Sequence, residues 1–62
     1  MQPDREALGF LYIEEENRRR DVEDRVLIAH NAGQACPELE RELAIRTRAV
    51  RTLGRLIADR GA

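Results

Sequence analysis

Apolar and polar residues alternate along this 62-residue chain with a helical period, in two stretches separated by a short polar break. The second stretch repeats its apolar residues about every 3.5 positions, as helices do when they pack along a common stripe. Its stripe contains Leu39, Leu43, Val50, Leu53 and Ile57, with Arg46 in the remaining position. The first stretch has on one face Leu8, Leu11, Tyr12, Val22, Val26 and Ala29, with Glu15 and Arg18 or Arg19 in the middle. Both stretches predict amphipathic helices.

Residues that favour helix ends define the limits of the two predicted helices. Pro3 or Asp4 suits the start of the first helix, and acidic side chains in its first turn interact favourably with the helix dipole. Gly33 suits a left-handed helix end, and Pro37 suits the first turn of the next helix. These signals predict helices over about residues 4–31 and 37–60.

The first helix contains a polar run, EEENRRRD, at residues 14–21. The run offers three acid-to-base pairs four residues apart, namely Glu14–Arg18, Glu15–Arg19 and Glu16–Arg20. Each such pair stabilises an exposed helix by about 0.2–0.5 kcal/mol. We therefore predict one continuous helix. The alternative is a break near Asn17, with Asp21 capping a shorter helix.

The two predicted helices complement each other when the chain folds back at the polar break. An antiparallel pairing brings Ala29 opposite Leu39, and the two stripes then face each other. Residues 1–36 carry 8 acids and 5 arginines, whereas residues 37–62 carry 4 acids and 6 arginines, so the halves attract. The expected fold class is all-α, an antiparallel two-helix hairpin that forms one domain over residues 1–62.

The apolar residues of this hairpin are too widely spread for two helices to cover. Residues 7–13 and 26–29 are apolar almost all round the helix, and such helices are normally buried on several sides. We therefore expect two hairpins to dimerise into a four-helix bundle. The predicted partner or dimer interface contains Leu8, Phe10, Leu11, Ile13, Leu53, Leu56 and Ile57. The alternative is a monomer that exposes a few aliphatic side chains.

Composition narrows the class of protein. Hydrophobic residues make up 42% of the chain and the net charge is −1, too apolar and too neutral for a disordered tail. A chain this short buries a thin core, and its single cysteine cannot form an internal disulfide, so association with another chain is favoured. No apolar run reaches the roughly 18 residues of a membrane span. The polar start is unlike a secretion signal, and we expect a cytoplasmic protein.

Few residues in the sequence could carry catalysis or bind a cofactor. The chain has no Ser and no Gly-rich phosphate loop, so we expect no enzymatic activity and no cofactor. His30 and Cys36 are the two soft metal donors, fewer than a metal site requires, so we expect no metal. His30 is expected to stabilise a helix C-terminus and Cys36 to be a small buried side chain.

The expected function is that of a small non-enzymatic helical interaction module. It would act as an adaptor, regulator or assembly subunit through its apolar helix face, against a second copy or another protein. A structural component of a larger particle is a further alternative.

A small DNA-binding regulator is the alternative from another class. The segment at residues 22–45 resembles a helix-turn-helix in the spacing of its small and apolar residues, Ala29, Ala32, Gly33, Ala35, Leu39 and Leu43. Its second helix, however, begins with Glu38, Glu40 and Glu42, which would repel a duplex.

Arginines in the second helix are the remaining candidates for binding. Arg48, Arg51 and Arg55 share a face that is either solvated or a stripe for an anionic partner. Arg46 lies nearer the apolar stripe, and we expect it to meet an acid of the first helix, such as Glu23.

Overall fold

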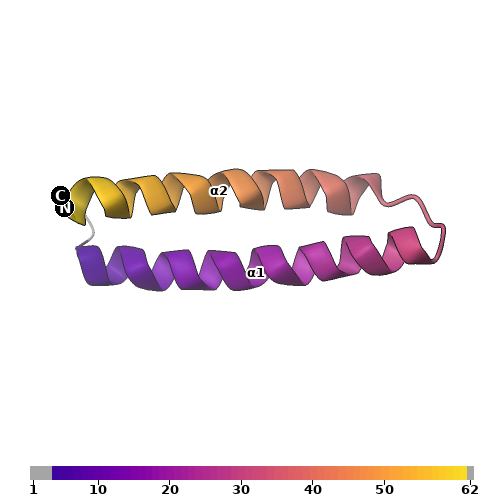
Figure 1. Cartoon of the computed structure of the whole chain (residues 1–62), viewed down its shortest axis with the longest axis horizontal. Helices are drawn as coiled ribbons and strands as arrows, with labels where there is room; N and C mark the ends of the chain where they lie inside the picture. Colours follow the sequence, from indigo (N-terminus) through magenta and orange to yellow (C-terminus); the bar gives the residue numbers. More distant parts are fainter. Residues whose placement is uncertain (1–3, 62) are drawn as a thin grey trace.

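The computed structural model of the chain describes residues 4–61, with the side chains of residues 4–59. Two helices, α1 (Arg5–Asn31) and α2 (Pro37–Gly61), are joined by a short loop. They lie side by side and antiparallel, so that the start of α1 is beside the end of α2 and the loop forms the other end (Figure 1). The hairpin measures 45 × 20 × 14 Å. The predicted all-α two-helix hairpin is confirmed, with helix limits within one residue of those expected.

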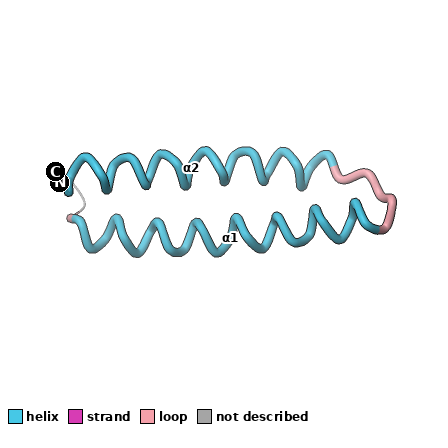
Figure 2. Tube along the Cα trace, viewed as in Figure 1, coloured by secondary structure: helices cyan, strands magenta, loops and turns pink. Residues whose placement is uncertain are grey.

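α1 is a single helix of 27 residues that continues through the polar run at residues 14–21 (Figure 2). The alternative of a break near Asn17 is therefore wrong. Of the three expected pairs, the structure forms the one between Arg20 Nε and Glu16 Oε1, at 3.2 Å. Glu16 also accepts a hydrogen bond from Arg19 at 2.8 Å, so one carboxylate serves two successive arginines.

Each helix begins with the residues that the sequence predicts. The Asp4 side chain accepts a hydrogen bond of 2.7 Å from the backbone N–H of Ala7, which satisfies one of the free amides at the start of α1. Pro37 is the first residue of α2, where its missing N–H costs nothing. Both starts are therefore fixed by local chemistry.

α1 ends in a Schellman motif centred on Gly33, whose φ is 71°. The Gly33 N–H donates to the carbonyl of His30 at 3.0 Å, and the Gln34 N–H donates to that of Ala29 at 2.9 Å. A residue with a Cβ adopts this backbone conformation only with strain. The expected left-handed helix end at Gly33 is confirmed, and it reverses the direction of the chain so that the next helix runs back along α1.

The apolar contact between the helices divides into two ends. The buried side chains are Leu8 near the start of α1 and Val22 and Val26 toward the loop. Facing them, the stripe residues of α2 are half-buried, namely Leu39, Leu43, Val50, Leu53 and Ile57. Leu11, which the sequence places on the same face, is instead 47% exposed. Two helices can cover one stripe, and a residue at its edge remains in solvent.

The middle of the contact is an ion-pair network in place of an apolar layer. Arg46 occupies the stripe of α2, and its Nη1 lies 2.8 Å from Glu15 Oε1 across the helix pair. Its Nε donates to Glu42 at 2.9 Å, within α2. Hydrogen bonds from Arg46 to Glu42 and then Glu15 raise the pKa of the guanidinium. The prediction that Arg46 meets an acid of the first helix is confirmed, but the acid is Glu15 and not the suggested Glu23.

Glu23 instead binds Arg19, the arginine that fills the stripe of α1, with Arg18 left exposed. Arg19 lies 3.1 Å from Glu23 and 2.8 Å from Glu16. Hydrogen bonding from Arg19 lowers the pKa of Glu16, because it stabilises the ionised carboxylate. Two half-buried arginines are thus neutralised by carboxylates on both helices.

The antiparallel arrangement also bears on the DNA-binding alternative. The two helices of a helix-turn-helix cross at about 90–120°. Here the helices that flank the loop run back along each other (Figure 1).

Within residues 4–61, neither helix has an apolar stretch of the length that a bilayer requires.

Reversing the charge of Glu15 is expected to destabilise the hairpin, because an arginine there would face Arg46. Glu15→Arg should lower the midpoint of thermal unfolding measured by circular dichroism, and the double change Glu15→Arg with Arg46→Glu should recover part of the loss. Glu14→Arg is the matched control, since Glu14 is exposed and the change in charge is identical. An equal loss in the control would contradict the inter-helix role of Glu15.

Two glycines are expected to respond to alanine with opposite signs. Gly33→Ala should destabilise the chain by about 1 kcal/mol, because of its positive φ. Gly9→Ala should stabilise it by about 0.5–1 kcal/mol, since Gly9 lies inside α1 and an added Cβ meets nothing within 4 Å. Urea unfolding of both variants measures the difference. Equal shifts would contradict the Schellman assignment.

Candidate functional site

Large apolar side chains are exposed at the end of the hairpin opposite the loop. Phe10 is 65% exposed, Ile13 58%, Leu11 47% and Leu56 44%. We call these four residues the apolar end surface. Exposed aliphatic residues are common singly, but a group that includes a phenylalanine is typical of a contact surface.

The heptad spacing explains why two of these residues lie on one edge of the hairpin. His30 comes directly after the stripe residue Ala29, and Glu40 directly after Leu39. These two side chains meet at 2.7 Å along one edge of the helix pair. Leu11 and Leu56 each precede a stripe residue, which places both on the opposite edge of an antiparallel pair. An apolar edge therefore continues outward from the stripe.

The other residues of the predicted interface lie in the contact between the two helices. Leu8 is buried in the contact between the helices, and Leu53 and Ile57 are half-buried there. Additional exposed apolar residues, which were not included in the predicted interface, are Leu27, Ile28 and Ile45. The apolar run at residues 26–29 is the sequence signal for the first two. Ile45 follows Leu43 and Ala44 and widens the apolar stripe of α2 to one side.

Arg48, Arg51 and Arg55 extend along the outside of α2. All three are exposed, and within residues 4–59 none of them forms an ion pair. They line a shallow hollow together with Ala44, Thr47 and Thr52. Uncompensated guanidinium groups at this spacing are able to contact an anion.

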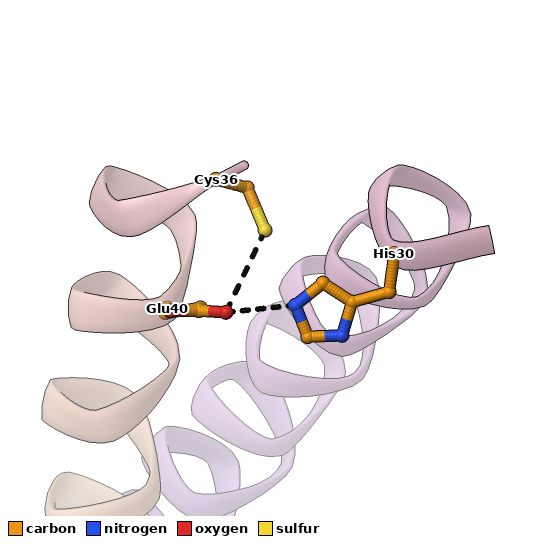
Figure 3. Close-up of side chains that lie close together, drawn as sticks. All are labelled: His30, Cys36 and Glu40. Carbon is orange, nitrogen blue, oxygen red and sulfur yellow. Dashed lines mark hydrogen bonds and ion pairs between the residues drawn. The ribbon is translucent and has the colours of Figure 1, made fainter. Parts of the chain in front are cut away.

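A second group of chemically active side chains gathers at the loop end (Figure 3). His30 comes from the last turn of α1, Cys36 from the loop and Glu40 from the first turns of α2. His30 Nε2 lies 2.7 Å from Glu40 Oε1, and Cys36 Sγ lies 3.9 Å from the same oxygen. Their donor atoms are all within 4.8 Å of one another.

Glu40 is the member of this group that sequence reasoning missed. It lies four residues after Cys36, and residues four apart in a helical turn point the same way. The spacing was therefore visible, but the approach of His30 depends on how tightly the loop turns. The expected role of His30 at the helix end also changes, because Gly33 and Gln34 cap the carbonyls while the imidazole turns to Glu40.

The environment of Cys36 keeps its thiol protonated. Partial burial is the main cause of its raised pKa, followed by the charge of Glu40 and the hydrogen bond to it. Since the thiolate is the reactive form, Cys36 is a poor nucleophile near neutral pH. The side chain is half-buried, less enclosed than the sequence predicts.

The chain has no significant match among protein-family models, curated proteins or solved structures.

Replacing Glu40 should make Cys36 more reactive. Glu40→Gln removes the negative charge beside Sγ, so the thiol pKa should fall and alkylation by iodoacetamide near neutral pH should accelerate by about two- to fivefold. Glu38→Gln makes the same change of charge two residues away and should leave the rate unchanged. Equal rates in both variants would show that the carboxylate of Glu40 does not act on the thiol.

Proposed function

We propose that this chain is a non-enzymatic helical interaction module that buries its apolar end surface against a second copy. Two hairpins would then form a four-helix bundle. The observation that supports the proposal is the exposure of Phe10, Leu11, Ile13 and Leu56 at one end of the hairpin, with Phe10 and Ile13 more than half in solvent. Such a surface gains free energy when another chain removes it from water.

The total surface area supports a second copy as the occupant. The chain exposes 5063 Å². A compact monomer of 7.1 kDa exposes about 4,100 Å², so the hairpin carries a surplus of about 1,000 Å². Two copies that each bury this surplus would share an interface of about 2,000 Å², the size of a stable specific complex.

Electrostatics is compatible with self-association. The net charge of −1 leaves little long-range repulsion between copies. A two-fold symmetric contact uses the same patch on both chains, so one apolar surface is sufficient. In such a bundle the module would act as an adaptor, regulator or assembly subunit. A larger particle would satisfy the same surface with non-identical neighbours.

A second candidate function is binding of an anionic partner such as duplex DNA. The exposed guanidinium groups of Arg48, Arg51 and Arg55, which have no ion-pair partner among the described side chains, support it. The acids at the start of α2 and the antiparallel helices weigh against it, because they would repel the duplex and prevent the usual docking geometry.

Leu11→Asp is expected to convert the dimer into a less stable monomer. A carboxylate at this edge would have to be desolvated in the bundle, so the dissociation constant of the dimer should rise by at least about tenfold. Sedimentation equilibrium measures the change. Asn17→Asp adds the same charge to an exposed position of α1 and should leave the dimer intact.

An unchanged dimer and unchanged melting in Leu11→Asp would exclude this interface. A wild-type chain that is monomeric but shifts duplex DNA in a gel, with strong weakening by salt, would favour the second candidate instead.

A further inference from the structure

We propose that the loop end binds a single Zn²⁺ ion, with His30 Nε2, Cys36 Sγ and Glu40 Oε1 as the three protein ligands. This site lies at the end of the hairpin opposite the apolar end surface, and its occupation does not depend on the proposed dimer (Figures 1 and 3).

The ligand set matches the preference of zinc. Imidazole nitrogen, thiolate sulfur and carboxylate oxygen are its usual ligands, and a thiolate disfavours the hard cations Mg²⁺ and Ca²⁺. Tetrahedral zinc bonds of about 2.0–2.3 Å place ligand atoms about 3.3–3.7 Å apart. The observed separations are 2.7 Å between nitrogen and oxygen and 3.9 Å between sulfur and oxygen. The nitrogen and sulfur lie within 4.8 Å of each other, so side-chain shifts of about 1 Å would bring the three atoms to these distances.

The cluster now holds two protons where a metal would sit. The His30 Nε2–H and the Cys36 thiol both point to Glu40 Oε1, an arrangement that zinc would replace. On binding, the thiol proton passes to the buffer, and the imidazole proton moves through solvent from Nε2 to Nδ1, which leaves the Nε2 lone pair free to coordinate. Among the described residues no fourth donor joins the group, so water would complete the tetrahedron.

The fold holds the three ligands in place without the metal. The Schellman motif fixes the backbone of His30, and the helix that Pro37 begins fixes that of Glu40, while their exposed side chains hold each other by the 2.7 Å contact. Cys36 lies between them, and its carbonyl accepts the backbone N–H of Glu40 at 3.0 Å. Ligands that converge before binding require little ordering, which favours affinity. Because the site joins both helices, zinc should stabilise the hairpin.

Titration of the full wild-type chain with Co²⁺, a spectroscopic substitute for zinc, tests the site directly. We expect one metal per chain, a thiolate-to-cobalt charge-transfer band and the intense visible absorption of a tetrahedral site. Zinc should displace cobalt, and the melting temperature should rise with zinc concentration.

Variants then identify the ligands. Cys36→Ser, His30→Gln and Glu40→Gln should each weaken zinc binding by about tenfold or more, since even outer-shell changes cost about that much. Glu38→Gln, matched to Glu40→Gln in residue type and charge, should stay within about twofold of the wild type. Circular dichroism confirms that each variant remains helical.

Three outcomes would overturn the proposal. The first is the absence of the thiolate charge-transfer band in the wild-type chain. The second is equal zinc affinity in Glu40→Gln and Glu38→Gln, which would reduce the cluster to a hydrogen-bonded clasp. The third is one metal for two chains, which would mean that the ligands come from different copies.

Discussion

The ion pair between Glu15 and Arg46 is the contact on which the arrangement of the hairpin depends. Two helices share a single interface, and its middle carries charge where a larger protein would place an apolar layer. Partly buried charges are costly unless paired, so the register that brings Glu15 of α1 to Arg46 of α2 is favoured over neighbouring registers. Arg19 on α1 is instead paired within its own helix, with Glu16 and Glu23.

This charged middle separates the molecule into two ends with different chemistry. Among the described residues, the fully buried apolar side chains are Leu8 at one end and Val22 and Val26 near the loop. With so little apolar surface buried inside, the stability of the hairpin is small compared with that of a larger domain. Apolar residues outside the stripe have no partner within the described chain, and the free energy of covering them is available for association.

The loop end differs because its chemistry comes from the turn itself. α1 ends at Asn31 and Pro37 begins α2, and the five positions between them, which include the left-handed Gly33, are too few to separate the helices. The side chains on either side of the turn are therefore pressed together, and they include the histidine and cysteine of the chain. The short turn thus brings polar side chains of both helices close together.

Local physics made much of this structure predictable from sequence. The 3.5-residue spacing determined both helices, and the residues Asp4, Gly33 and Pro37 determined their ends, because helix caps depend on near neighbours. The continuity of α1 followed from pairing within one turn. The partner of Arg46 was not predictable in this way, because long side chains choose among several carboxylates according to distances across the pair. The union of His30 with Cys36 and Glu40 was likewise decided by the tertiary structure, since it depends on how closely the two helices approach at the loop.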